Sequence, residues 1–266
     1  MPLPDRLPSL LNIETAEQYS VSIRLRAGGL AFVLHSKELT QELYAETFDL
    51  QTGHPDYKSG IEDLYFRYPF LSYPYHSVRI YYEPLVYSLV PADLYDESRA
   101  ALWLQPIADE KKVGTAHDWE VYTVPLQDKR KLIVSAADKP LMQFLRRSML
   151  VTKPEIFLSP IIEEQGQLSR KNGYKQLSVV LRQKGFDCML FDDGELVLLN
   201  SFPLSTDLPD SIPGELMYYI MLLWRTYECN QEQDSLIILP DEPSLRSTAT
   251  KVQLALHRFI RQISLA

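Results

Sequence analysis

The chain has 266 residues, of which 45% are hydrophobic and 23% are charged, and its formal net charge is −8. These values are typical of a globular protein with a large core, and the acidic balance argues against a general nucleic-acid binder, because phosphates need a cationic face. Residues 1–12 lack the pattern of a signal peptide, and the most apolar run, 216–224, is far shorter than the roughly 20 residues of a membrane span, so we expect a cytoplasmic protein without a membrane span.

The first part of the chain reads as strands interrupted by an aromatic-rich region. Residues 20–25 alternate apolar and polar side chains and predict a strand, residues 27–29 supply a glycine turn, and residues 30–34 predict the returning strand. Residues 37–77 crowd many aromatic residues together and are interpreted as an insertion between the second and third strands. Residues 78–90 are rich in β-branched and aromatic residues and predict the third strand.

Helices and strands then alternate up to residue 162. Pro91 is suited to the start of a helix, and residues 119–124 and 131–135 predict two further strands. Asp138 can cap the helix that follows, and the apolar residues 155–162 predict a strand.

The stretch 163–173 is the most loop-like of the chain, and we place the boundary between two lobes there, giving lobes 1–165 and 166–266. In the second lobe, residues 175–182, 186–191 and 195–202 predict three consecutive strands. Later elements are a helix capped by Asp210 or Ser211, a strand at 235–239, and a final helix whose apolar face extends to Ile263.

The two lobes share a short repeat, which predicts that they are related. The stretch YSVSIRLRAGGLAF, at 19–32, aligns with the beginning of the second lobe. The matched pairs are Ser22 with Ser178, Leu25 with Leu181, Arg26 with Arg182, Gly29 with Gly185 and Leu30 with Phe186.

The repeat and the element order resemble the actin-like ATPase superfamily. The resemblance implies an α/β fold with two lobes, each a mixed sheet formed by a three-strand meander and then helix, strand and helix, with flanking helices. More narrowly, residues 86–97 (VYSLVPADLYDE), residues 195–202 (ELVLLNSF) and Tyr218-Tyr219 resemble a bacterial family of unknown function with a reduced actin-like fold. That resemblance implies no activity.

The chain departs from the active superfamily at each nucleotide-binding position. Active members carry Asp-x-Gly in the first hairpin of each lobe and a Gly-Gly turn after a late strand, because a carboxylate must organise the metal and glycine lets phosphate approach. Here these positions read RLRAGGL (24–30), LRQKGF (181–186) and LPDEP (239–243). We therefore predict a pseudo-ATPase with no catalytic residues, no cofactor and no metal site.

Two groups of residues are candidates for binding. The hairpin residues Arg24, Arg26, Gly28, Gly29, Arg182 and Gly185 could hold an anion in the cleft between the lobes, or the arginines could be solubilising charges at strand edges. In the aromatic-rich region Tyr57, Tyr65, Tyr68 and Tyr73 could bind a protein partner, or their rings could cover a sheet edge or fill the core.

The sequence thus favours a non-catalytic actin-like protein that acts as a scaffold or protein-binding module, with a partner whose identity it does not give. Nor does it indicate the oligomeric state. One alternative is an atypical nucleotide-binding ATPase or kinase, which would need a carboxylate such as Asp187 or Asp207 to enter the cleft. Another is an anion or small-molecule sensor that uses the same cleft.

Overall fold

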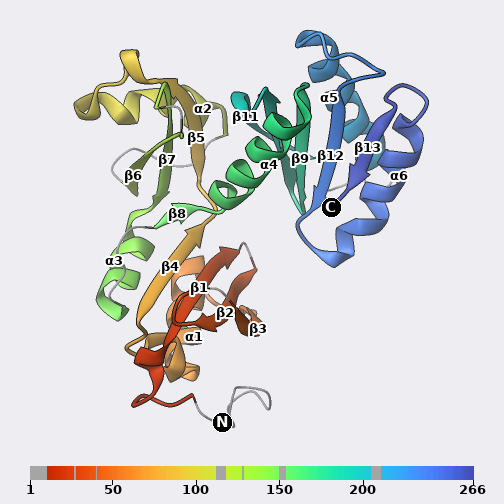
Figure 1. The fold of residues 1–266 in the computed structure, drawn as a ribbon. Coiled ribbons are helices and arrows are strands. Elements are labelled where there is room, and N and C mark those ends of the chain that lie inside the picture. Colours follow the sequence, from red (N-terminus) through yellow and green to blue (C-terminus); the bar gives the residue numbers. More distant parts are fainter. Residues whose placement is uncertain are drawn as a thin grey trace. The chain divides into compact units, whose positions relative to one another are not determined.

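The computed structural model describes residues 11–26, 28–39, 41–111, 118–127, 129–149, 154–204 and 211–266. The chain divides into two compact units, Met1–Ser159 and Pro160–Ala266. Each unit contains its own five-stranded sheet, and the first unit carries an additional three-stranded sheet (Figure 1).

The main sheet of the first unit has the order β3-β2-β1-β4-β8. Its strands are β1 (Tyr19–Arg26), β2 (Gly29–Ser36), β3 (Glu42–Asp49), β4 (Ser77–Tyr82) and β8 (Glu155–Ile156). The first three form an antiparallel meander, while β4 runs parallel to β1. Helix α1 (Tyr57–Arg67) follows β3 and begins at Asp56, whose carboxylate accepts a hydrogen bond from the Ser59 amide.

The second sheet of this unit has the order β5-β7-β6. It comprises β5 (Val86–Pro91), β6 (Trp119–Pro125) and β7 (Lys131–Asp138), all antiparallel to their neighbours. Among the described residues, the helices of this unit besides α1 are η1 (Ala16–Gln18), η2 (Pro69–Ser72), η3 (Ala92–Leu94), η4 (Glu97–Trp103), α2 (Gln105–Lys111) and α3 (Lys139–Ser148). As predicted, the Asp138 side chain caps α3 by accepting a hydrogen bond from the Leu141 amide.

The sheet of the second unit has the order β11-β10-β9-β12-β13. Its strands are β9 (Gln176–Arg182), β10 (Gly185–Asp192), β11 (Glu195–Pro203), β12 (Ser235–Pro240) and β13 (Gln262–Leu265). The described helices of this unit are α4 (Leu158–Asn172), which begins in the last two residues of the first unit, α5 (Ile212–Thr226), η7 (Pro243–Leu245) and α6 (Arg246–Leu256). Leu216 and Trp224 of α5 and Val252 of α6 pack in one buried cluster with side chains of β9, β10 and β12.

The two main sheets repeat one topology, which confirms the predicted fold class. In each, a three-strand meander is followed by a helix, a strand parallel to the first, another helix and an edge strand. In the first unit these are α1, β4, α3 and β8, and in the second α5, β12, α6 and β13. The three-stranded sheet lies between β4 and α3 in the sequence, so it is the addition specific to the first unit.

The predicted insertion at 37–77 is therefore wrong, because this region supplies two elements of the repeated topology, β3 and α1. Strand β3 lies at the edge of the sheet, and only Tyr44 and Phe48 on it are buried. A strand with so few buried side chains has a weak alternating pattern, which is why the sequence did not reveal it.

The predicted strand 78–90 is two strands in different sheets, β4 and β5, separated at Pro84. Proline has no amide hydrogen to donate to a sheet, and a break at this position lets the chain leave one sheet for the other. The residues after Pro91 form the 3-10 helices η3 and η4 before α2 begins, rather than one α-helix.

The predicted strand 155–162 and loop 163–173 are also corrected, since β8 ends at Ile156 and α4 occupies 158–172. The buried face of α4 includes Gln165 and Ser169, which are 2% and 0% exposed. The Gln165 side-chain oxygen accepts a hydrogen bond of 2.8 Å from Gln176 on β9. Because hydrogen bonds between polar side chains replace apolar packing on this face, α4 lacks the apolar stripe from which an amphipathic helix is predicted.

The final predicted helix ends early. Helix α6 stops at Leu256, and Ile263 belongs to β13, which pairs with β12 in parallel. Strand β13 alternates exposed and partly buried residues, but it has four residues, which are too few for this alternation to identify a strand from the sequence. At the start of α5, Ser211 occupies the capping position without a side-chain hydrogen bond, and Asp210 lies outside the described residues.

Candidate functional site in the hairpin turns and an adjoining pocket

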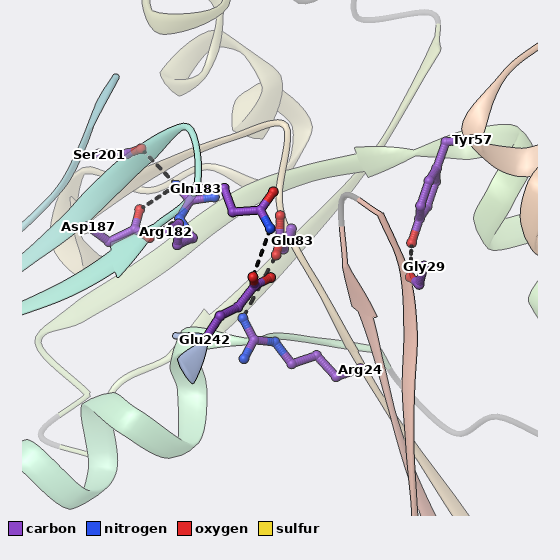
Figure 2. Close-up of polar contacts among 9 residues, drawn as sticks. All are labelled: Arg24, Gly29, Tyr57, Glu83, Arg182, Gln183, Asp187, Ser201 and Glu242. Carbon is purple, nitrogen blue, oxygen red and sulfur yellow. Dashed lines mark hydrogen bonds and ion pairs between the residues drawn. The ribbon is translucent and has the colours of Figure 1, made fainter. Parts of the chain in front are cut away.

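The first hairpin joins β1 to β2, and the side chain of its Arg24 is held by two neighbouring side chains. The Arg24 guanidinium lies 3.8 Å from the Glu83 carboxylate (Figure 2). It also lies 4.5 Å from the ring centre of Phe157. Arg26 is the last residue of β1, where it pairs with Gly29 across the turn. Arg24 is thus placed by an ion pair and an aromatic ring of its own unit.

Gly29 of this hairpin has a packing role. A Cβ atom on Gly29 would lie 2.0 Å from the Phe48 carbonyl oxygen of β3, so only glycine allows this strand to approach. The Gly29 carbonyl accepts a 3.0 Å hydrogen bond from the Tyr57 hydroxyl of α1 (Figure 2). Gly28 is exposed, and its carbonyl accepts a hydrogen bond from the Leu50 amide.

The second hairpin, between β9 and β10, repeats that close approach. A Cβ atom on Gly185 would lie 2.5 Å from the Phe202 carbonyl oxygen of β11, the third strand of its meander. The shared glycine of the sequence repeat therefore has the same structural explanation in both units, because each lets the third strand lie against the start of the second.

Arg182 of this hairpin is part of a buried ion pair. Its Nε lies 2.7 Å from the carboxylate of Asp187, which is fully buried, and a second nitrogen is bonded to Asp187 and to the Ser201 hydroxyl (Figure 2). Asp187 is one of the two carboxylates considered for an atypical nucleotide site, and here it neutralises Arg182. The other, Asp207, lies outside the described residues.

The turn of the second hairpin is bonded to the turn that follows β12. The Gln183 side-chain amide donates a 2.7 Å hydrogen bond to the Glu242 carboxylate (Figure 2). The Asp241 amide also donates to the Leu181 carbonyl at 2.9 Å, which extends the contact between β9 and β12. The resemblance described above predicts phosphate and adenosine sites at these two turns, and in the structure the turns carry two side chains joined to each other.

The four tyrosines predicted to bind a partner lie in the first unit with different exposure. Tyr65 is 7% exposed and its hydroxyl contacts the Met149 sulfur at 3.4 Å, so it belongs to the core and is removed from the predicted surface. Tyr57, Tyr68 and Tyr73 are half-buried, and the Tyr68 ring lies 4.7 Å from that of Phe48. Desolvation raises the pKa of Tyr57 and Tyr65 above the ordinary value, so both hydroxyls stay protonated.

A pocket of about 480 Å³ adjoins the first hairpin. It lies at the carboxyl ends of β1, β4 and β7 and at the first turns of α1 and α3, which contribute Leu25, Arg26, Tyr57, Glu83 and Leu141 among others. The carboxyl ends of adjacent parallel strands are where open α/β sheets usually place ligands. Sequence reasoning found Arg26 and Tyr57 but missed Glu83 and the α3 residues, because nothing in the sequence brings β4 and α3 together.

The charged groups around this pocket are paired within the protein. Asp56 and Asp138 accept hydrogen bonds from the amides at the starts of α1 and α3, and the first of these bonds lowers the pKa of Asp56. Lys58 is paired with Glu62, and Glu83 faces Arg24. With its charges satisfied and apolar walls, the pocket suits an apolar ligand group better than a phosphate.

No metal-binding constellation is evident in the part of the chain that the structure describes, where no three His, Cys, Asp or Glu side chains are grouped suitably. Among the described helices, none is long and apolar enough to cross a membrane. The thiol of Cys188 is buried, and desolvation raises its pKa well above the usual value.

Comparison with protein families gives one match over most of the chain. Residues 8–263 match the family described as "Protein of unknown function (DUF3822)". The chain belongs to this family. The family resemblance predicted from the sequence is thereby confirmed, and no curated protein matches the chain.

Solved structures support the fold. A protein from Bacteroides thetaiotaomicron VPI-5482, described as having an actin-like ATPase fold and unknown function, is 21% identical with a TM-score of 0.80, over 97% of this chain and 94% of that one. A chain of the PilM-PilN type IV pilus biogenesis complex is 10% identical with a TM-score of 0.58, over 93% and 88%. At these identities the likeness establishes an actin-like fold for this family member.

Proposed function

We propose that this protein is a non-catalytic actin-like protein that works by binding a partner protein. The observation that carries the proposal is the hydrogen bond between Gln183 and Glu242. Active members of the superfamily present a carboxylate and glycines at the corresponding turns to hold a metal–nucleotide complex. In this protein the Glu242 carboxylate stands at the turn where active members have glycines, so it would repel the phosphates of a nucleotide placed there, and the hydrogen bond between Gln183 and Glu242 would have to break.

The ion pairs of both hairpins support the same conclusion. Arg182 is committed to Asp187, and Arg24 is 3.8 Å from Glu83. Binding an anion through either arginine would leave a carboxylate without its counter-ion, and for the buried Asp187 that loss is strongly unfavourable. Gly29 and Gly185 are fully explained by close strand packing, so they give no independent support to a phosphate-binding role.

A binding role agrees with one structural relative. The PilM-PilN type IV pilus biogenesis complex contains a chain of similar fold that is assembled with another protein. This precedent supports protein binding as a use of the fold, and the partner of the present chain is a separate question.

The test is thermal unfolding of the whole protein with and without millimolar Mg²⁺-ATP, Mg²⁺-ADP and Mg²⁺-GTP. A ligand that binds the native state at about 100 times its dissociation constant adds about 2.7 kcal/mol of stability and raises the midpoint clearly. We expect no rise for any of the three nucleotides. A rise for one of them that is lost without Mg²⁺ would overturn the proposal in favour of an atypical ATPase or kinase.

A small-molecule sensor is the second candidate, and the pocket of about 480 Å³ favours it. Leu85 lines this pocket and is 36% exposed, so Leu85→Trp can fill the space without disturbing the core. Screening metabolites by thermal unfolding would support the sensor if a compound raises the midpoint of the wild type and not of Leu85→Trp. An equal rise in both proteins would place the compound elsewhere.

A further inference from the structure

We infer that a second pocket of the first unit, of about 500 Å³, is a docking site for an acidic segment of a partner protein. The inference deepens the proposed function by naming the binding surface and the chemistry of the partner. Its lining includes Lys37, Tyr73, Tyr75, His76, Arg146 and Arg147, which we call the basic tyrosine pocket.

Four segments that are separate in the sequence form this pocket, and η1, which carries Glu17, is one of them. Lys37 directly follows β2, the tyrosines and His76 lie between η2 and β4, and the two arginines are in the last turn of α3. The pocket therefore depends on the packing of α3 near the start of β4, which only the folded unit provides.

The cations of the basic tyrosine pocket exceed its acids. Among the described residues, the exposed Lys37 and Arg147 form no ion pair, whereas Arg146 is bonded to both carboxylate oxygens of Glu120. Glu17 is the carboxylate in the lining. Lys37 and Arg147 are thus two uncompensated cations, in the sense that neither has an ion-pair partner in the described part of the chain, and they outnumber Glu17 in the lining. Because Arg146 is balanced by Glu120, the pocket keeps an excess of positive charge, which favours an anionic ligand.

The pocket beside the first hairpin differs in this respect. There, Asp56 and Asp138 cap helices and Lys58 is paired with Glu62, so the charges are used inside the protein. Of the two pockets, the basic tyrosine pocket is the one with charge left to attract a ligand.

The tyrosines provide a wall and a hydrogen-bond donor. The rings of Tyr73 and Tyr75 lie 6.5 Å apart, and the Tyr75 hydroxyl donates a 2.7 Å hydrogen bond to the Phe70 carbonyl, which holds its ring in place. In the described part of the chain the Tyr73 hydroxyl has no hydrogen-bond partner, so it can donate to an incoming carboxylate. Rings that combine apolar area with a polar tip are favoured anchors at protein interfaces.

A protein segment fits these features better than a nucleic acid. A nucleic acid would need an extended cationic face to offset repulsion from a chain of charge −8, and the pocket offers two uncompensated cations at one place. A short acidic segment needs only one or two carboxylates at the cations and side chains against the tyrosine rings. Volumes of this size accommodate a few side chains.

The experiment pans a random peptide display library on the purified full-length protein. The pocket variant Lys37→Glu with Arg147→Glu reverses the two uncompensated cations. The control variant Lys251→Glu with Arg258→Glu makes the same change in net charge at two exposed cations of the second unit that form no ion pair among the described residues. Unfolding curves of the variants check that both remain folded.

We expect peptides rich in Asp and Glu from the wild type and from the control variant, with dissociation constants about tenfold weaker on the pocket variant, the loss of about two partly exposed charge contacts. Tyr73→Phe should weaken the same peptides by a smaller factor, because it removes only the hydroxyl. Adding salt should weaken binding to the wild type more than to the pocket variant.

The inference is overturned if no peptides are enriched, if the enriched peptides are not acidic, or if they bind the pocket variant as tightly as the control. Tighter binding of a single-stranded oligonucleotide than of the best peptide would also overturn it and favour nucleic acid as the ligand. These failures are distinct from failure of the proposed function, which shows as a nucleotide-dependent rise in the unfolding midpoint.

Discussion

Replacing Arg182 with methionine tests whether this arginine is a structural counter-ion or an available anion-binding group. Methionine preserves much of the apolar stem and removes the guanidinium. The carboxylate of Asp187, 0% exposed, then loses the ion pair at 2.7 Å and stays buried beside an uncharged side chain. The fold has to keep that carboxylate charged and unpaired or bind a proton there.

The expected cost follows from the burial of the pair. Removing one partner of a buried ion pair typically costs about 3–5 kcal/mol. The Arg182 side chain is 23% exposed, so water reaches one side of the pair, and the expected loss falls slightly below that range, to about 2–4 kcal/mol. With a slope of about 2 kcal/mol per molar urea, the midpoint of unfolding should fall by about 1–2 M.

The assay is urea unfolding followed by fluorescence, with two further variants. Arg182→Met combined with Asp187→Asn removes both charges and should recover most of the lost stability. Arg261→Met removes a guanidinium paired with Glu232, but both side chains are mostly exposed, so its unfolding curve should match that of the wild type.

Two results would refute the reasoning. A loss below about 1 kcal/mol for Arg182→Met would mean that Asp187 does not need this counter-ion and that Arg182 is available for an anion. A double variant that is no more stable than Arg182→Met would mean that the loss comes from packing rather than from an unpaired charge.

Further predictions concern other sites. Gly185→Ala should destabilise the protein by about 1–3 kcal/mol in urea unfolding, because the new Cβ would overlap a carbonyl oxygen of β11. In the control Gly28→Ala the new Cβ would meet no atom within 4 Å, so its stability should stay within about 0.5 kcal/mol of the wild type. The Arg146 guanidinium lowers the pKa of Glu120 below its usual 4.5, so this pair stabilises the fold above pH 4.5, and its contribution is lost as the pH falls through the lowered pKa. Arg146→Met should therefore make the free energy of unfolding depend less on pH below 4.5. An unchanged pH profile would contradict this. The buried Cys188 should resist alkylation in the native protein and react once urea unfolds it, as followed by mass spectrometry, and rapid native modification would disprove its burial.

Local patterns predicted most of the second unit. The run from Lys175 onward has continuous apolar strands with predicted turns at Lys184-Gly185 and Asp193-Gly194. The structure confirms β9, β10 and β11 and the second turn, while the first turn lies one residue earlier, at Gln183-Lys184. Buried strands joined by short glycine turns carry their signal within the strand itself, so tertiary context is not needed to recognise them.

Prediction from the sequence failed for elements that bury few side chains or bury polar ones. Strand β3 buries two aromatic side chains, and α4 faces the β9 sheet partly with Gln165 and Ser169. In both cases the neighbours that complete the element, β2 for β3 and the Gln176 amide for α4, lie elsewhere in the chain. The hydrophobic period alone therefore underestimates such elements.

The sequence by itself determined the α/β class, the internal repeat of Arg26-x-x-Gly29 and Arg182-x-x-Gly185, and the family resemblance, because each depends on residues that are neighbours along the chain. Only the tertiary structure decided that both repeat glycines admit a third strand, that Arg182 neutralises Asp187, and that Lys37 and Arg147 share a pocket. The reason is physical: close approach of backbones, pairing of buried charges and convergence of surface cations are relations between segments far apart in sequence, and packing alone brings those segments together.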